Sequence, residues 1–213
     1  MKATARKQVS YDASIFTSVE TVDDAIRIIV TPEAGLTSHH RWDVETSRLI
    51  DLIGPWICRN CLVLDYGCGI GRIAKPIIKK FGCTVIGVDI AANMRALAAS
   101  CVDSDRFAAV PPDVLQWFRR DFDFAMAIWT LQHVLYLRDT VHMLSFMLRD
   151  GAKFFVVNNV GRALPTTGGW IDDGIDVRTV LKDHFIEIEC GRLSNDIAPG
   201  AFGESTFWAI YQK

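Results

Sequence analysis

The feature that most constrains this chain of 213 residues is a glycine-rich turn between a buried strand and a helix. Residues 61–65 (CLVLD) form an apolar run that ends in a carboxylate, as expected for a central strand covered on both faces. Residues 65–71 (DYGCGIG) follow, and a helical pattern then continues to Phe81. Glycines at alternate positions let the backbone bend sharply and approach a ligand closely. This strand, turn and helix predict an α/β fold with a mainly parallel sheet.

The rest of the chain alternates β-rich runs with helical patterns. Further strands are expected at residues 84–89, 106–110, 122–129, 153–158, 186–189 and 206–211. Helices are expected at residues 41–56, 91–101, 134–148 and 177–185. We therefore predict one domain over residues 41–213, preceded by an extension or lid over residues 1–40.

Two acids flank the turn in a way that indicates the ligand. Dinucleotide sites use G-x-G-x-x-G beneath a pyrophosphate, whereas this chain has G-x-G-x-G, with Asp65 two positions before Gly67. A carboxylate there repels a pyrophosphate but attracts a cationic amino group, which suits the methionine end of S-adenosylmethionine. Asp89 closes the next strand, where an acid can accept ribose hydroxyls. The alternative is that both acids only cap turns.

Three segments resemble the successive motifs of class I S-adenosylmethionine-dependent methyltransferases: residues 65–71, Val88-Asp89, and residues 122–133. The similarity runs from Leu62 to Asn159, nearly half the chain. It implies a methyltransferase with a Rossmann-like, seven-stranded, mostly parallel sheet, helices on both faces and an antiparallel last strand. S-adenosylmethionine would be the cofactor and S-adenosylhomocysteine the product.

The resemblance also implies which residues contact the cofactor. Asp65 and the turn would lie on its methionine and ribose side, Asp89 at the ribose, and Ile90 against the adenine. Pro112-Asp113-Val114 stands where the family often has Gly-Asp, so Asp113 is a candidate for the adenine amino group or for a helix N-cap. The full set of cofactor candidates is Arg41, Asp65, Gly67, Cys68, Gly69, Gly71, Asp89, Ile90, Asp113, Val114 and Trp129.

The catalytic candidates lie at the end of the fourth strand. Trp129 could pack against the activated methyl group, since aromatic faces suit cations, or it could be a core residue. His133 has the intrinsic pKa of a general base, but it can also serve packing or a helix start. Methyl transfer depends mainly on alignment and on exclusion of water, so a dedicated base is needed only when the acceptor loses a proton early.

The segment after the fifth strand holds the candidates for binding the methyl acceptor. Amides, an arginine, an indole and a carboxylate gather there, and together they could bind a hydroxylated or amino substrate. The alternative is a solvated glycine-rich loop. The candidates are Asn158, Asn159, Arg162, Trp170 and Asp172.

Composition limits the partners. The net charge is −2 and the pI about 6.2, so no basic field favours nucleic acid or an anionic membrane. We expect a cytoplasmic protein with a small-molecule acceptor, no metal, and six cysteines present as buried free thiols. The alternatives are a protein or RNA methyltransferase, a non-catalytic cofactor-binding regulator, and, least favoured, a nicotinamide dehydrogenase. The oligomeric state is left open.

Overall fold

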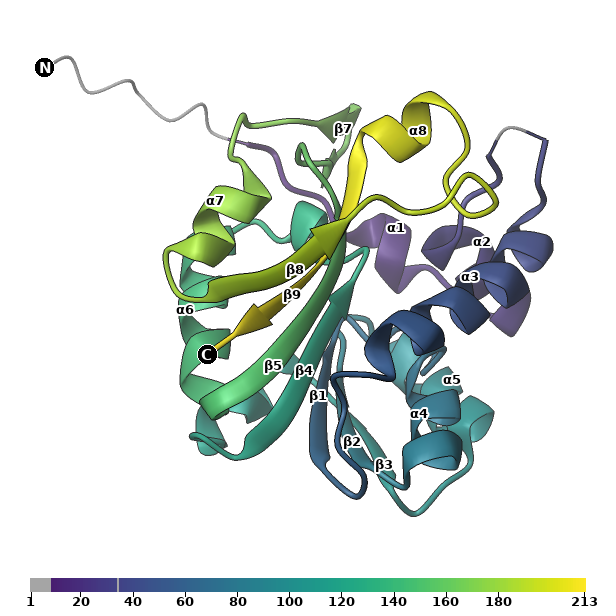
Figure 1. Ribbon diagram of the computed structural model, residues 1–213. Coiled ribbons are helices and arrows are strands. Elements are labelled where there is room, and N and C mark those ends of the chain that lie inside the picture. The colour runs from purple at the N-terminus through teal and green to yellow at the C-terminus, as the bar shows by residue number, and fades with distance from the viewer. Residues whose placement is uncertain (1–8, 34) are drawn as a thin grey trace, which may run out of the picture.

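The computed structural model describes residues 9–33 and 35–213. Residues 1–8 and 34 of the expected extension lie outside the described residues. Helices flank both faces of a central sheet: α3, α4 and α5 on one side, α6 and α7 on the other (Figure 1).

The helices and strands have the following bounds. The α-helices are α1 (Ser14–Thr17), α2 (Val22–Ile29), α3 (Ser38–Ile53), α4 (Ala74–Phe81), α5 (Ala92–Val102), α6 (Leu137–Met147), α7 (Val177–Lys182) and α8 (Ala201–Glu204). Two 3-10 helices are η1 (Pro112–Trp117) and η2 (Leu131–His133). The strands are β1 (Leu62–Tyr66), β2 (Thr84–Val88), β3 (Phe107–Val110), β4 (Phe122–Ile128), β5 (Leu148–Asn159), β6 (Leu164–Thr166), β7 (Gly169–Ile171), β8 (Ile186–Gly191) and β9 (Thr206–Gln212).

The main sheet has seven strands in the order β3-β2-β1-β4-β5-β9-β8. The neighbours among β1 to β5 pair in parallel, and β9 lies antiparallel between β5 and β8. The predicted seven-stranded, mostly parallel sheet with an antiparallel last strand is therefore confirmed. The strand order reverses direction at β1, so a crevice opens at the carboxyl ends of β1 and β4.

The core consists of one layer on each face of the sheet. Side chains of β5 alternate between the layers because successive residues of a strand point to opposite faces. Phe154 and Val156 pack with α6 and α7, and Phe155 and Val157 pack with α3 and α4. All four are fully buried, which explains why β5 reads as a continuous apolar run.

The helix boundaries differ from the prediction where capping was overlooked. α3 begins at Ser38 rather than at residue 41, because Thr37 Oγ1 accepts a hydrogen bond from the backbone N–H of His40. α2 was not predicted at all. It begins with a capping box in which the side chains and backbone N–H groups of Thr21 and Asp24 bond reciprocally.

The chain after β4 also differs from the expected single helix. The residues just after the strand form η2, and α6 begins only at Leu137. Its expected last residue, Leu148, starts β5 instead. The 3-10 turn keeps Thr130, Gln132 and His133 close to the carboxyl end of β4.

The cysteines are free, but not all are buried. Cys58, in the loop after α3, and Cys190, on the edge strand β8, are exposed, and Cys101 of α5 is only partly buried, so the expectation of six buried thiols is wrong for these three. Cys61 Sγ, just before β1, lies 3.4 Å from Cys83 Sγ, just before β2. Within the described residues there is no cluster of three potential metal ligands, and no helix there is long and apolar enough to cross a membrane.

Candidate active site

A cavity of about 760 Å³ opens at the carboxyl ends of β1, β2 and β4. Its floor comes from the turns after these strands, and its opposite wall comes from α1, α2 and the β6–β7 hairpin, which lie over this end of the sheet (Figure 1). The cofactor and catalytic candidates in the lining are Arg41, Gly67, Gly69, Asp89, Ile90, Trp129 and His133.

The glycine turn leaves no room for side chains. Gly67 has φ +80°, and a Cβ there would lie 2.1 Å from Thr130 Oγ1. A Cβ on Gly69 would lie 2.6 Å from Ile29 Cδ1 of α2. Gly71 serves packing instead, because its Cβ would lie 2.2 Å from Val102 Cγ2 of α5, and Gly71 does not line the cavity. The first two glycines line the cavity, and the close approach of Thr130 and Ile29 requires glycine at both positions.

Asp89 connects the two turns that form the cavity floor. Its Oδ2 accepts a hydrogen bond from Gly69 N at 2.9 Å, and its Oδ1 accepts one from Ala91 N at 2.9 Å. Burial raises the pKa of this carboxyl above its ordinary value, and the two N–H donors oppose that rise. Asp89 lines the cavity, and each of its oxygens can accept one further hydrogen bond.

Asp65 lies beneath the turn rather than in the cavity lining. It is only 4% exposed. Burial first, and the charge of Asp89 second, raise its pKa to about 8. We expected both acids to border the cofactor. In the structure, Asp89 lines the cavity and Asp65 lies behind the lining. A cation bound above the turn would favour the ionised form of Asp65.

Of the remaining cofactor candidates, Arg41, Ile90 and Trp129 line the cavity. The Cys68 thiol is buried against Gly87 of β2. Pro112 lines the cavity, but Asp113 and Val114 do not. The N-cap of η1 is Pro111 and Asp113 follows inside the helix, so the N-cap alternative for Asp113 is wrong.

Trp129 forms part of the cavity wall in an unusual backbone conformation. Its φ is +57°, in the left-handed region. Its Nε1 donates a hydrogen bond to Glu45 Oε1 at 2.6 Å, and its ring stacks on Phe202 with centroids 5.7 Å apart. The indole is thus held from α3 on one side and from α8 on the other.

His133 lines the cavity as a neutral ring. Its Nδ1 lies 2.6 Å from the carbonyl oxygen of Ala163, which can only accept, so Nδ1 carries the proton. Nε2 then accepts from Gln132 Nε2 at 3.1 Å. Burial lowers the pKa of His133 to about 4, which makes it a weak base at neutral pH.

The acceptor-binding candidates are divided by the structure. Asn159 and Trp170 line the cavity, and Asn159 Oδ1 is buried without a hydrogen-bond partner among the described residues. The other three are outside the lining. Asn158 is fully buried and bonds to the backbone of Gln132 and Asn159, so its amide supports η2.

Arg162 and Asp172 also serve the loop itself. Arg162 Nη2 donates to the carbonyl of Val134 and lies 3.6 Å from Asp173. Asp172 Oδ1 accepts from Gly174 N at 2.8 Å. In this arrangement both residues hold the segment after β5 in place rather than reach the cavity.

The expected extension supplies cavity residues that sequence reasoning did not single out. Tyr11 and Phe16 line the cavity, and Tyr11 forms an antiparallel bridge with Thr166 of β6. Phe16 and Trp170 lie on opposite segments with ring centroids 6.0 Å apart, and both contact His133. We call residues 11–16 together with the β6–β7 hairpin the roof. The helix α1 has only four residues, too few to show a helical pattern of apolar residues, so it could not be predicted from the sequence.

Arg41 lines the cavity, but its guanidinium is already engaged. Nε donates to Ile197 O at 3.2 Å, Nη1 donates to Thr31 O, and Nη2 lies 3.4 Å from Glu45 Oε2. A hydrogen bond from Arg41 to the cofactor would therefore compete with the bonds of this guanidinium to Thr31, Ile197 and Glu45.

Comparison with known proteins identifies the family. The family described as methyltransferase domain matches residues 38–165. This chain belongs to that family. The match includes the glycine turn, Asp89, Trp129 and His133.

Two curated relatives of this methyltransferase domain are similar over part of their length. Sterol 4-C-methyltransferase strm-1 of Caenorhabditis elegans is 30% identical over 141 residues, 63% of this chain and 40% of that protein. Methyltransferase GfsG of Streptomyces halstedii is 28% identical over 137 residues, 61% of this chain and 46% of that protein. The chain thus spans less than half the length of these two relatives.

A solved structure shows the same fold. Geranyl diphosphate C-methyltransferase from Streptomyces coelicolor A3(2) superposes with a TM-score of 0.64 over 96% of this chain and 89% of that chain. The two sequences are 13% identical, so the likeness concerns the fold.

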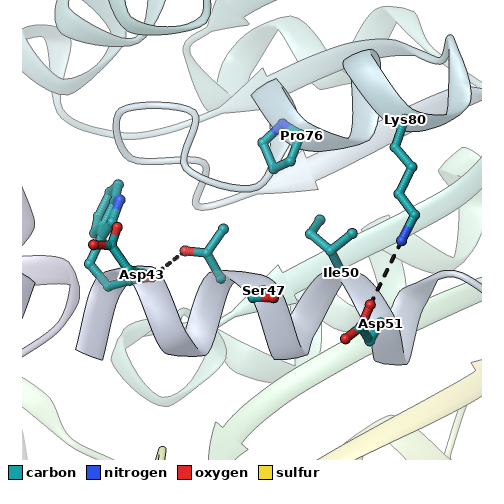
Figure 2. Close-up of a pocket in the computed structure, with 8 residues that line it drawn as sticks. Asp43, Ser47, Ile50, Asp51, Pro76 and Lys80 are labelled. Carbon is teal, nitrogen blue, oxygen red and sulfur yellow. Dashed lines mark hydrogen bonds and ion pairs between the residues drawn. The ribbon is translucent and has the colours of Figure 1, made fainter. Parts of the chain in front are cut away.

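A second groove of this methyltransferase domain lies between α3 and α4 and has a volume of about 380 Å³. Figure 2 shows Lys80 of α4 reaching toward Asp51 of α3, with Nζ 3.7 Å from Oδ1. Both side chains are more than half exposed, so the pair is screened by water. The lining residues all come from helix surfaces, away from the strand ends where ligands bind in folds of this class.

Proposed function

We propose that this chain binds S-adenosylmethionine in the large cavity and transfers its methyl group to a small, largely apolar acceptor. The observation that carries the proposal is the hydrogen bond between Asp89 and the backbone of Gly69 beside the cavity. This bond joins an acid at the end of a strand to the glycine turn. Trp129 lines the same cavity.

The residues present fit this cofactor. Gly67 and Gly69 line the cavity, and a side chain on either would collide with Thr130 or Ile29. Asp89 keeps acceptor positions for the ribose hydroxyls, and Ile90 offers a half-exposed apolar surface to the adenine. Asp65 gains its charge most readily beside a cation, which suits the amino group of the methionine end.

S-adenosylmethionine, when bound, supplies a methyl group on a positively charged sulfur. The protein's part is to orient the acceptor and to keep water out. The roof closes the side of the cavity opposite the glycine turn with Phe16 and Trp170. Neutral His133 packs against both rings and can accept a proton only weakly, so alignment is the larger contribution here.

The lining on the roof side supports an apolar acceptor. Aliphatic and aromatic side chains dominate it, and they favour an apolar molecule by burying its surface. They are Ile15, Phe16, Val134, Leu135, Tyr136, Ala163 and Trp170. Asn159 lines the cavity, and its buried Oδ1, which has no hydrogen-bond partner among the described residues, would accept one hydroxyl or amino hydrogen once the amide turns toward the acceptor. The names of the relatives agree with this class, since one refers to a sterol and another to geranyl diphosphate.

We also propose that the segment before α3 acts as a lid on a domain that begins near residue 38. Its described residues contribute Tyr11, Phe16 and Ile29 to the cavity. Apart from packing, it is tied to the hairpin by the Tyr11–Thr166 bridge and by a bond from Asp12 N to Pro165 O at 2.9 Å.

Calorimetry tests the cofactor, and radiolabelled methyl transfer tests the acceptor. We expect S-adenosylmethionine and S-adenosylhomocysteine to bind and NAD not to bind. Sterols and isoprenoid alcohols should accept label, and peptides and RNA should not. Binding without transfer to any of these would favour a cofactor-binding regulator, and transfer to peptide or RNA would overturn the small-molecule assignment.

A matched pair of variants localises the acceptor. Trp170 lines the cavity and is 49% exposed, whereas Trp117 is 80% exposed and lies outside the lining. Trp170→Ala should raise KM for the acceptor at least fivefold and leave cofactor affinity unchanged. Trp117→Ala should change neither value. Equal effects from both variants would place the acceptor elsewhere.

A further inference from the structure

Glu45 is a fully buried carboxylate that the sequence does not mark as functional. It lies on α3 with no exposed surface. Its Oε1 accepts hydrogen bonds from Trp129 Nε1 at 2.6 Å and from Arg72 Nη2 at 2.9 Å. Its Oε2 lies 3.4 Å from Arg41 Nη2. A buried charge persists only when it is paired and hydrogen-bonded, and this one has three partners.

The partners of Glu45 connect separate parts of the cavity wall. Arg72 directly follows Gly71, so it belongs to the glycine turn. Arg41 also donates to the carbonyls of Thr31 and Ile197, which lie before α3 and in the loop before α8. Through these two arginines, Glu45 is linked to the turn, to the segment over the cavity and to the C-terminal loop.

Trp129 depends on Glu45 for its position. With φ at +57°, its backbone is in a region that a tryptophan rarely adopts. Phe202 stacks on one side of the ring, and the bond to Glu45 fixes its polar edge. An indole held at its N–H and on one face cannot rotate about its side-chain bonds without losing a charge-assisted hydrogen bond.

We propose that Glu45 is a positioning residue that holds the Trp129 ring toward the charged sulfur of the bound cofactor. The inference rests on the proposed function. An aromatic face attracts a cation, so the fixed indole should favour positively charged S-adenosylmethionine over neutral S-adenosylhomocysteine. Glu45 thereby acts through Trp129 on the ratio of the affinities for S-adenosylmethionine and S-adenosylhomocysteine, without contacting either molecule.

A double-mutant cycle tests the proposal with S-adenosylmethionine and S-adenosylhomocysteine as the probes. Glu45→Gln keeps an acceptor oxygen but removes the charge, and Trp129→Phe keeps a ring but removes the N–H. Each should reduce the ratio of the two affinities, measured by calorimetry, by roughly two- to tenfold. The double variant should show no further loss, because Glu45 acts through Trp129.

Trp208→Phe is the matched control. Its indole Nε1 also donates a hydrogen bond, to Arg192 O at 3.2 Å, but it lies on β9 outside the cavity lining. The control should leave the affinity ratio unchanged. Additive effects of Glu45→Gln and Trp129→Phe, or an equal effect of Trp208→Phe, would overturn the proposal. If Glu45→Gln does not fold, the comparison of Trp129→Phe with Trp208→Phe still decides whether the indole sets the ratio.

A spectroscopic measurement separates this inference from the proposed function. The indole N–H resonance of Trp129 is assigned by its loss in Trp129→Phe. It should exchange slowly with solvent and should move in Glu45→Gln. An unmoved resonance contradicts the Glu45 contact. Wild-type protein that binds neither probe refutes the proposed function, and with it the role in cofactor balance, even when the resonance confirms the contact.

Discussion

Asp89, directly after β2, accepts a hydrogen bond from the backbone N–H of Gly69, with 2.9 Å between Oδ2 and N. One carboxylate therefore fixes the bend that follows β1. The same group accepts from Ala91 N at the start of α5. Its position therefore depends on two turns at once, and both turns border the cavity.

Asp89→Asn should weaken the binding of S-adenosylmethionine by roughly 1–3 kcal/mol, because charged hydrogen bonds to the ribose and to Gly69 are lost. Calorimetry measures the change. Asp105→Asn, at an exposed acid outside the lining, serves as the control and should leave affinity unaltered. Undiminished affinity in folded Asp89→Asn protein would show that the ribose is held elsewhere.

Gly67→Ala should destabilise the protein much more than Gly151→Ala. Both glycines have similar φ angles, +80° and +83°, so both variants carry the backbone strain of roughly 1–2 kcal/mol. Only Gly67→Ala adds a collision, since its Cβ would lie 2.1 Å from Thr130 Oγ1, whereas nothing lies within 4 Å at Gly151. Urea denaturation gives both free energies of unfolding, and equal losses would contradict the crowding at Gly67.

Asp65 should make the cofactor-free protein less stable as pH rises. The folded-state pKa is raised from 3.8 to about 8, so the stabilising contribution is complete below pH 3.8 and is lost as the pH approaches 8. Asp65→Asn stays neutral and should lack this decline in urea denaturation between pH 4 and 8. A wild-type curve parallel to that of the variant would mean that Asp65 is already ionised.

His133 should make the protein less stable as the pH falls. Its folded-state pKa is lowered from 6.5 to about 4, so its contribution is present above pH 6.5 and is lost as the pH falls through 4, by roughly 3 kcal/mol in total. His133→Gln can still donate to Ala163 O without titrating, and it should flatten the acid side of the stability curve. The expectation fails if wild type and variant lose stability equally over that range.

The sheet and the glycine turn could be predicted because their signals are local. The apolar run of β5 and the spacing of Gly67, Gly69 and Gly71 are visible within a few residues. Glu45 could not be found in this way, because its partners Arg72 and Trp129 are 27 and 84 residues distant. The same holds for the roof, where Tyr11 meets Thr166 only after the chain has folded.

The expected roles of Asn158 and Arg162 illustrate a different limit. Their polarity and their position near the end of β5 fitted a binding pocket, but in the structure Asn158 Oδ1 accepts from Gln132 N and Arg162 Nη2 donates to Val134 O. Residue type and position along the chain did not distinguish Asn158 from Asn159, whereas strand alternation sends adjacent side chains to opposite faces.

The cavity wall is built from residues inside and outside the range shared with the family. Gly67, Asp89 and Trp129 fall inside residues 38–165, the range shared with the family, while Phe16 and Trp170 flank that range on either side. On the proposed function, exchange of these two outer segments would change part of the acceptor wall and leave Gly67, Asp89 and Trp129 in place.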